Sequence, residues 1–202
     1  MSTTVTAAEV KALRQKTGAG LMECKAALQE SGGDAEKAFE ALRITMGKKA
    51  QKLAQRETTE GLIGQYIHAT GKVGVLVQVE CNTDFVAGND IFKDFVADLA
   101  LHIAGSPSTL YVNEAEIPED VLEAEKKIYV AQIEDNKPLE IREKIAEGKL
   151  RKWKEEIVLL DQKHINVDKH DNKTIEQLRA DASTRTGENI VIKKFARFQI
   201  GA

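Results

Sequence analysis

The sequence predicts an α+β protein in which a helical N-terminal module precedes a small antiparallel sheet with helices and a projecting helical hairpin. Three observations support this prediction. Capped helical patterns fill residues 1–47, two alternating patterns flank a glycine turn near residue 71, and two long helical patterns lie at about 118–160. The 202 residues, of which 42% are hydrophobic and 30% charged, suffice for one or two ordinary globular domains.

Composition excludes several classes of protein. The net charge of −3 gives no overall basic bias, which argues against a dedicated nucleic-acid binder. The two cysteines, Cys24 and Cys81, form no disulfide framework and fit a reducing compartment. No apolar run approaches the roughly 18 residues that a membrane span needs, and Met1–Thr6 resembles no secretion or import signal. We therefore expect a cytoplasmic protein that does not enter a membrane.

The N-terminal module is predicted to contain three short helices. Thr6–Glu9 matches a capping box at the start of the first helix. A second helix is expected over Leu21–Ser31, where two glycines stop it. Asp34 is a suitable N-cap for the third helix, which we expect to end at Gly47. These helices would form a small bundle over residues 1–47.

A basic stretch follows this module. Lys48–Arg56 contains four basic residues and no acidic one. It could be a surface for RNA or for an acidic partner. A charge run is more commonly a solvated segment, so we expect a partly helical linker at residues 48–59 and a core domain at 60–202.

The sheet is expected to begin with a hairpin. Strands over Leu62–Ala69 and Val73–Cys81 flank Thr70–Lys72, where glycine can adopt a positive φ. Alternate residues of the second strand, from Val73 to Cys81, are apolar and share one face. A helix with apolar residues at helical spacing should follow over Asn89–Ala104.

Between that strand and that helix lies the turn Cys81–Gly88, which carries Asp84 next to Phe85. One interpretation is structural: Asp84 caps the following helix and Phe85 packs as a hydrophobic staple. The other is functional, because a turn at the end of a strand is held firmly but reaches solvent, where its side chains can contact a partner.

The remaining chain is predicted to alternate helices with short extended segments. We expect a short strand at Leu110–Val112 and a helix from Pro118, the first helical residue, to about Asn136. A second helical stretch, Leu139–Leu160, should be interrupted by Gly148 and complete a hairpin. The apolar seam of this hairpin is expected to comprise Leu122, Ile128, Ile133, Ile145, Trp153 and Ile157.

The C-terminal part is expected to return to the sheet. Asn166–Asn172 is polar and turn-like, and Ile175 with Leu178 indicates one more helix. The last strand, Asn189–Ile200, must pair with the earlier hairpin or leave an edge open. We expect one face of this strand to be formed by Ile190, Ile192, Ala196, Phe198 and Ile200, with Lys194 as the exception.

No pattern for nucleotide, metal or covalent chemistry is present. The glycines around Gly71 lack phosphate-loop spacing, and Thr17–Gly20 lies between helices rather than after a strand. The four histidines show no zinc spacing with the cysteines. Cys81 could be a nucleophile, but no orienting third group suggests itself. We expect no cofactor, no metal site and no enzymatic activity.

Long motifs resemble a known family. The stretch VKALRQKTGAGLMECKAAL (Val10–Leu28) resembles the N-terminal signature of translation elongation factor Ts, and VECNTDFVA (Val79–Ala87) is similar to that family's second signature. The ending, from Gly187-Glu188-Asn189-Ile190 to Phe195-Ala196-Arg197-Phe198, is similar to its closing strand. The resemblance covers essentially the whole chain and matches a short form with a single core unit.

This resemblance implies a guanine nucleotide exchange factor for elongation factor Tu in translation elongation. It would bind elongation factor Tu in its GDP-bound and nucleotide-free states, without binding nucleotide directly and without requiring nucleic acid. The first three helices would form a module like a ubiquitin-associated domain. Within that module, the resemblance implies that the residues in contact with the partner are Arg14, Leu21, Met22 and Lys25. The resemblance also implies that one turn disturbs the magnesium site of the partner, and the residues of this turn are Thr83, Asp84, Phe85 and Val86.

Three hypotheses remain open at this point. The first is the exchange factor, which could also form a homodimer through its sheet. The second is a different binding module, whose helical N-terminus recruits a ubiquitin-like or RNA partner; it leaves Thr83–Val86 unexplained. The third is a thiol enzyme that uses Cys81, whose activity a Cys81→Ser substitution would abolish.

Overall fold

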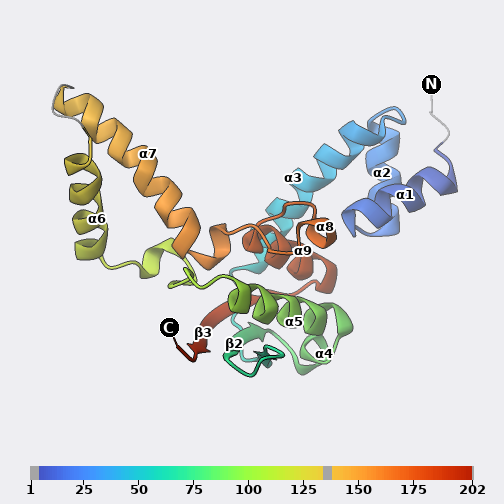
Figure 1. Ribbon diagram of the computed structural model, residues 1–202. Helices are drawn as coiled ribbons and strands as arrows, with labels where there is room; N and C mark the ends of the chain where they lie inside the picture. Colours follow the sequence, from blue (N-terminus) through green and yellow to red (C-terminus); the bar gives the residue numbers. More distant parts are fainter. Residues whose placement is uncertain (1–4, 134–137, 202) are drawn as a thin grey trace. The chain divides into compact units, whose positions relative to one another are not determined.

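The computed structural model describes residues 5–133 and 138–201 and combines helices with a small antiparallel sheet, which confirms the α+β class (Figure 1). Its helices are α1 (Ala7–Thr17), α2 (Leu21–Glu30), α3 (Ala35–Leu53), α4 (Asp84–Ala87), α5 (Asp90–Gly105), α6 (Glu119–Ala131), α7 (Leu139–Ile157), α8 (Val167–His170) and α9 (Ile175–Thr186). Its strands are β1 (Glu60–Ile67), β2 (Val73–Cys81) and β3 (Val191–Gln199).

The chain divides into two compact units, each assembled from separate segments. One unit combines the chain up to Ile63 with Gln78–Ala97 and Gln177–Ile192. The other consists of Gly64–Val77, Asp98–Glu176 and the residues from Lys193 onward. None of the helices in the described part of the chain has both the length and the apolar character needed to cross a bilayer. The division into 1–47, 48–59 and 60–202 stays a prediction.

Helices α1, α2 and α3 share one hydrophobic core. The capping box at Thr6 is present, because the Thr6 hydroxyl accepts a hydrogen bond from the Glu9 N–H and the Glu9 carboxylate accepts one from the Thr6 N–H. The buried residues of the core are Val10, Leu13, Ala19, Cys24, Ala27, Leu28, Ala38, Leu42 and Met46. Local caps and a shared apolar face thus specify these helices.

The predicted end of α3 at Gly47 is wrong, since the helix continues to Leu53. Glycine in a helix interior costs about 1 kcal/mol relative to alanine. Met46 and Leu53, seven residues apart and therefore on one helical face, are both buried, and this burial outweighs the cost. The first basic residues of the 48–59 segment consequently lie on the last turns of α3.

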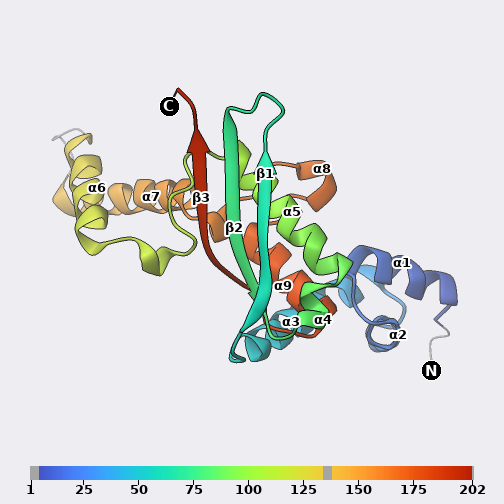
Figure 2. The ribbon, with the colours of Figure 1, turned by 90° about the horizontal axis from the view of Figure 1, so that it is seen from below.

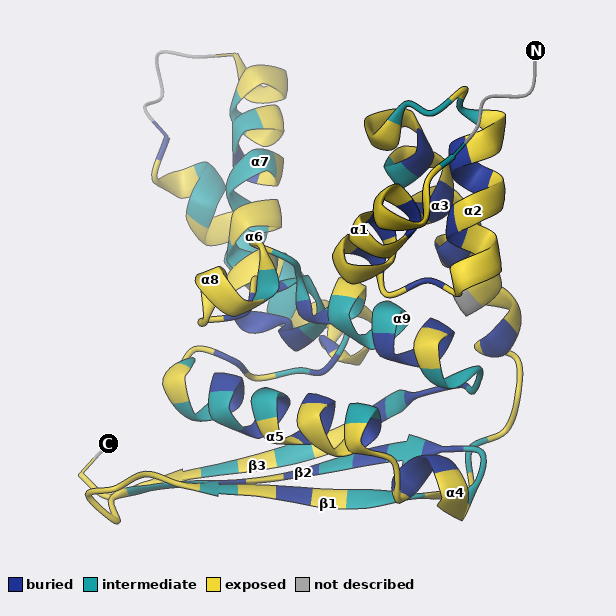
Figure 3. Ribbon diagram, turned by 90° about the vertical axis from the view of Figure 1, so that its right-hand side faces the viewer, coloured by how far each residue is buried: buried dark blue, intermediate teal, exposed yellow. Residues whose placement is uncertain are grey.

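The sheet has the strand order β1-β2-β3, with β2 in the centre (Figure 2). The hairpin turn is present, and Gly71 has a φ of +68°. The predicted apolar face of β2 is confirmed for Val75, Val77, Val79 and Cys81, which are buried. Helix α5 covers this face of the sheet (Figure 3), and its buried residues include Phe92, Phe95, Val96, Leu99 and Ile103.

The closing strand pairs with β2, which is one of the two outcomes expected from the sequence, but its residues do not form one buried face. Ile192 is buried, whereas Phe198 is 66% and Ile200 is 72% exposed. Two consecutive exposed residues, Lys193 and Lys194, shift the alternation by one position, the effect expected of an extra residue in a strand. The expected single apolar row is therefore wrong beyond Ile192.

Helices α6 and α7 lie side by side as a hairpin (Figure 1). Helix α6 ends at Ala131 rather than near residue 136, which lies outside the described residues, and Pro118 is its N-cap rather than its first helical residue. Helix α7 runs without interruption through Gly148. The expected seam is correct for Ile133 and Ile157, which are buried, but wrong for Ile128, which is 49% exposed.

Two further expectations differ from the structure. The expected strand Leu110–Val112 is reduced to an isolated parallel bridge between Tyr111 and Val158. The polar segment 166–172 contains the short helix α8, whose N-cap Asn166 accepts a hydrogen bond from the Lys169 N–H. A polar segment with a good cap can form one helical turn, which composition alone does not indicate.

Candidate functional site

The turn that follows β2 contains the one-turn helix α4. Its N-cap is Thr83, whose hydroxyl accepts a hydrogen bond from the Val86 N–H at 3.4 Å. Asp84 is the first helical residue, and the Gly88 N–H closes the turn on the Asp84 carbonyl at 2.8 Å. The chain therefore changes direction within a few residues, and a short, hydrogen-bonded helix carries Asp84 and Phe85.

Phe85 points into solvent with 85% of its surface exposed, while Val86 and Ala87 beside it are buried. The outer side of α4 is accordingly exposed in Figure 3. The structural interpretation of this turn is thus wrong, because Phe85 does not staple a helix to the core. Asp84 does not cap α5 either, since the side chain at its start is Asn89, which accepts a hydrogen bond from the Ile91 N–H at 2.8 Å.

A remote carboxylate holds the turn from beneath. One oxygen of Glu188, Oε2, accepts hydrogen bonds from the backbone N–H groups of Asn82 and Thr83, both at 3.0 Å. The other, Oε1, accepts the Thr83 hydroxyl at 2.7 Å. The neighbouring Asn189 N–H donates to the Asn82 side-chain oxygen at 2.9 Å. Segment 188–189 therefore fixes both residues that precede α4.

Sequence reasoning missed Glu188, Asn189 and Asn82 as members of this site. Glu188 lies 105 residues from Thr83 along the chain, so no local spacing connects them. All three residues are within the matched family motifs, but nothing in those motifs pairs one with another. Four hydrogen bonds to the turn become visible only when β3 lies beside β2.

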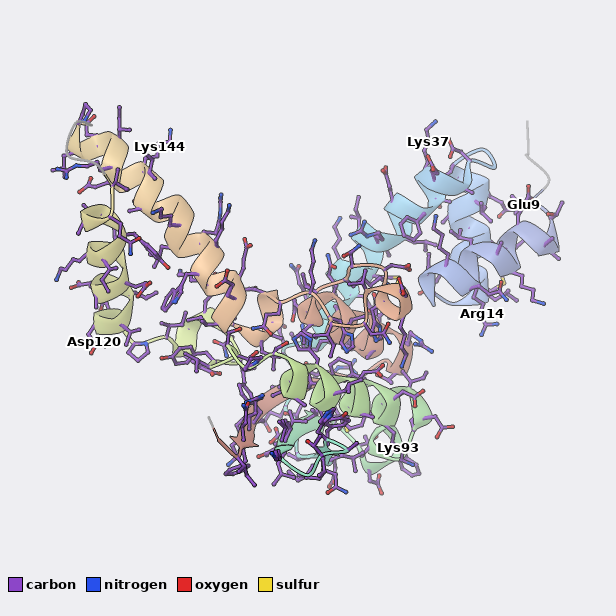
Figure 4. The ribbon with its side chains drawn as sticks, in the orientation of Figure 1. Glu9, Arg14, Lys37, Lys93, Asp120 and Lys144 are labelled. Atoms are coloured by element: carbon purple, nitrogen blue, oxygen red, sulfur yellow. The ribbon has the colours of Figure 1, made fainter. Side chains whose placement is uncertain are left out.

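The second group of sequence-predicted residues lies on α1 and at the start of α2. Arg14, labelled in Figure 4, and Lys25 are both exposed. Leu21 and Met22, in the first turn of α2, are 53% and 71% exposed. Two adjacent exposed apolar side chains, together with exposed cations on the same helical module, are the composition expected of a partner surface.

The thiol of Cys81 is poorly suited to nucleophilic chemistry. It is buried and donates a hydrogen bond to the Thr83 carbonyl at 3.2 Å. Burial raises the pKa of Cys81 to about 11, and the negative charge of Glu188 acts in the same direction. A reactive cysteine instead has a lowered pKa and access to solvent. Among residues 5–133 and 138–201, no group of three or more metal-binding side chains is present.

A family model with the description Elongation factor TS matches residues 3–202 of this chain. The chain belongs to the elongation factor Ts family. An elongation factor Ts from Thermodesulfovibrio yellowstonii is 48% identical over 197 residues, which cover 98% of this chain and 96% of that protein. One from Geotalea uraniireducens is 50% identical over 198 residues, which cover 98% of this chain and 90% of that protein.

Membership of the elongation factor Ts family supports a role in translation elongation as the nucleotide exchange factor of elongation factor Tu. The family signatures in the sequence include both the exposed turn at Thr83–Val86 and the exposed start of α2. These are the two regions in which a partner contact is expected.

Proposed function

We propose that this chain binds elongation factor Tu carrying GDP and accelerates GDP release through the exposed turn at Thr83–Val86. Magnesium bridges the phosphate oxygens of a bound nucleotide and offsets their charge. A side chain that displaces the elements holding this ion weakens nucleotide binding without touching the nucleotide. The observation that carries the proposal is Phe85, a phenylalanine with 85% of its surface in solvent on a well-anchored turn.

Exposure of Phe85 has a cost that binding to a partner would recover. Burying one phenylalanine yields roughly 1.5–3 kcal/mol. This free energy corresponds to about a 10- to 100-fold change in an equilibrium constant. A larger acceleration needs additional contacts, and Asp84, exposed beside Phe85, is available for one.

We assign the remaining binding free energy to the N-terminal module. Leu21 and Met22 would enter an apolar surface of the GTP-binding domain of elongation factor Tu, with Arg14 and Lys25 pairing with acidic groups at its rim. Because coupling between two ligands is reciprocal, a factor that weakens GDP binding is itself weakened by GDP to the same extent. Nucleotide rebinding would then eject the factor, and no bond is made or broken by this chain.

We propose that a second copy of this chain binds the outer face of the sheet to form a homodimer. Ile67, Leu76 and Phe198 on that side are 65%, 47% and 66% exposed. A twofold interface pairs the same surface of both copies, so an apolar sheet face is self-complementary. Sedimentation equilibrium at micromolar concentration tests this proposal, because a mass equal to one chain would contradict it.

The release of fluorescent GDP from elongation factor Tu tests the proposed function. Wild type should accelerate release strongly. Phe85→Ala should still bind but release GDP at least several-fold more slowly, because about 1–2 kcal/mol of the contact is lost. The matched control is Leu110→Ala, which shortens a side chain that is 62% exposed and outside both proposed contacts.

Each result has a distinct meaning. If wild type leaves GDP release unchanged, the exchange function is wrong, and the hypothesis of a different binding module gains support. If wild type accelerates release but Phe85→Ala equals it, the exchange function stands and the assignment to Phe85 is wrong. If Leu110→Ala slows release as much as Phe85→Ala, loss of any exposed apolar side chain explains the effect.

A further inference from the structure

We propose that Glu188 is a positioning residue for nucleotide exchange, which holds the turn at residues 82–86 in the conformation that presents Phe85. This inference rests on the proposed function and extends it to a residue that contacts neither the nucleotide nor, on this assignment, the partner. Glu188 precedes β3 and is half-buried beneath the turn. Its side chain is therefore part of the support of Phe85 rather than of the exposed surface.

The carboxylate of Glu188 fixes the backbone immediately before α4. Both of its oxygens are used, and all three donors come from the consecutive residues Asn82 and Thr83. Hydrogen bonds to an ionised carboxylate are roughly twice as strong as those between neutral groups. Two adjacent N–H groups directed at one oxygen restrict the backbone dihedral angles between them, which sets the direction in which α4 leaves the sheet.

Thr83 transmits this constraint to Phe85. A carboxylate can only accept hydrogen bonds, so the Thr83 hydroxyl must donate its single proton to Glu188. Its lone pairs then remain for the Val86 N–H, which donates to it at 3.4 Å. The hydroxyl thus connects Glu188 to the first turn of α4, and the orientation of this turn keeps Phe85 in solvent while Val86 and Ala87 are buried.

Asn189 connects the same support to the end of the N-terminal helices. Its side-chain N–H₂ group donates to the carbonyls of Ala54 and Arg56 at 3.3 and 2.8 Å, while its backbone N–H donates to Asn82. Asn189 is buried, with 3% exposed. The Ser183 hydroxyl of α9 also donates to the Glu188 carbonyl. Residues 188–189 are therefore anchored on several sides, as a rigid support requires.

A fixed turn matters for exchange because ordering a loop during binding costs free energy. If Phe85 were mobile, part of its burial energy would go to restricting it, and less would remain to displace the magnesium-holding elements. Loss of Glu188 should then lower the maximal rate of GDP release more than it raises the concentration of factor needed for half-maximal release, since Leu21 and Met22 still dock.

The first test measures fluorescent GDP release from elongation factor Tu over a range of factor concentrations. Glu188→Ala should lower the maximal rate about tenfold, which corresponds to about 1.4 kcal/mol. Glu188→Gln keeps one acceptor oxygen and should lower it less. Thr83→Val removes the connecting hydroxyl with little change of shape, and Thr83→Ser restores it, so Ser should rescue the rate that Val loses.

A double-mutant cycle separates positioning from general damage. If Glu188 acts through Phe85, then Glu188→Ala should have almost no further effect in a chain that already carries Phe85→Ala. If the two losses multiply instead, Glu188 acts by another route and the proposal is overturned. The control is Glu40→Gln, which neutralises an exposed carboxylate on α3 and should leave release unchanged.

Folding and the underlying function are checked in the same experiment. Circular dichroism establishes the temperature at which every variant is folded, and if Glu188→Ala is unfolded there, the Thr83→Val and Thr83→Ser pair decides. Failure of wild type to release GDP would refute the exchange function itself. Acceleration by wild type, loss with Phe85→Ala and full activity of the Glu188 and Thr83 variants would refute only the positioning role.

Discussion

The helices at the N-terminus and the turn after β2 are held in opposite ways. At α1 the cap is local, with Thr6 and Glu9 three residues apart, and at α2 the Glu23 carboxylate accepts the Gly20 N–H at the same spacing. The turn depends on a residue 105 positions further along the chain. Local hydrogen bonds are encoded where they act, whereas the turn has, besides its own short-range bonds, contacts with Glu188 and Asn189 that the local sequence does not reveal.

The difference also concerns where each region obtains its stability. The N-terminal helices bury their own core, in which Cys24, Leu28 and Ala38 are completely inaccessible. Between the end of β2 and the start of α5, only Val86 and Ala87 are buried, and this segment relies on hydrogen bonds. A cooperative apolar core tolerates the loss of surface groups, but a short turn held by one carboxylate does not. Substitutions at the exposed start of α2 should therefore remove a contact without changing the fold. Loss of Glu188 should instead change the conformation of the turn that carries Phe85.

The largest expected effect is on the free energy of unfolding, and a comparison of two leucines of α2 tests it. Leu28→Ala removes a fully buried side chain from the core of α1, α2 and α3, and we expect it to lower the free energy of unfolding by about 3 kcal/mol. Leu21→Ala changes a side chain that is 53% exposed and should alter that free energy by less than about 0.5 kcal/mol. Urea denaturation followed by circular dichroism measures both.

The same pair separates stability from binding. Leu21→Ala should weaken binding to elongation factor Tu although the protein stays folded, because it removes part of the proposed docking surface. Equal stability losses for the two variants would mean that the start of α2 is packed rather than exposed. Unchanged binding of Leu21→Ala would remove this residue from the proposed contact.

Features that depend on neighbours in sequence were predictable. The capping box at Thr6, the hairpin turn at Gly71 and the buried face of β2 follow from spacing and residue type alone. Errors arose where tertiary burial overrode a local signal. Helix α3 passes Gly47, where Met46 and Leu53 are buried, and α7 also continues through Gly148, two residues after the buried Ala146. The shift of alternation in β3 occurs at Lys193 and Lys194, but one polar exception in an otherwise apolar row does not by itself predict such a shift.

The candidate site was predictable only in part, for the same reason. The motif around Thr83–Val86 pointed to the turn, and the exposed position of Phe85 favours partner contact over the staple. Glu188 could not be assigned, because a carboxylate before a strand is compatible with many roles and its partners are remote. Pairing between distant segments is a property of the sheet, and a single sequence does not reveal it.

The second prediction concerns acid, to which long-range and local contacts should respond at different pH. His102 is buried, receives a hydrogen bond from the Ile165 N–H at its Nδ1 and donates from Nε2 to Gln162, so it is neutral. Burial lowers the pKa of His102 from 6.5 to about 4, the Gln162 hydrogen bond opposes this shift, and the neighbouring His164 adds to it.

The unfolded chain therefore binds more protons than the folded chain between about pH 6.5 and pH 4, and stability should rise with pH across this interval. We expect a loss of about 2 kcal/mol between pH 7 and pH 5, measured by urea denaturation with Trp153 fluorescence. His102→Asn should abolish most of this dependence, whereas replacing the exposed His68 by Gln should preserve it. A loss that persists in His102→Asn would assign it to other groups.

The N-terminal caps should respond only at lower pH. The pKa of Glu9 lies below its usual value of 4.5, chiefly because its carboxylate accepts the Thr6 N–H, and that of Asp34 is lowered by the Lys37 N–H. Their contributions are present above the usual carboxyl range and are lost as the pH falls through the lowered values. Acid should thus weaken the region around His102 before it weakens α1 and α3.

The smallest expected effect compares a local with a long-range ion pair in and near the α6–α7 hairpin. Lys127 and Glu123 are one helical turn apart at 3.8 Å, and both side chains are well exposed. Lys154 instead pairs at 2.8 Å with Glu114, which is 40 residues away along the chain. The Lys154 side chain is 24% exposed and that of Glu114 is 54% exposed. Shielding from water strengthens an ion pair, and a pair that joins distant segments restricts the chain more than one within a helix.

We expect Lys154→Met to lower the free energy of unfolding by about 1 kcal/mol and Lys127→Met by less than about 0.5 kcal/mol. Methionine keeps the length and apolar stem of lysine in both variants, so the difference isolates the charge. Urea denaturation at low and at 1 M salt makes the comparison, because salt screens the exposed pair more completely. Equal losses at low salt would mean that the separation of the two residues along the chain does not increase the stability gained from an ion pair at this surface. The contrast between locally and remotely held regions would then apply to buried contacts alone.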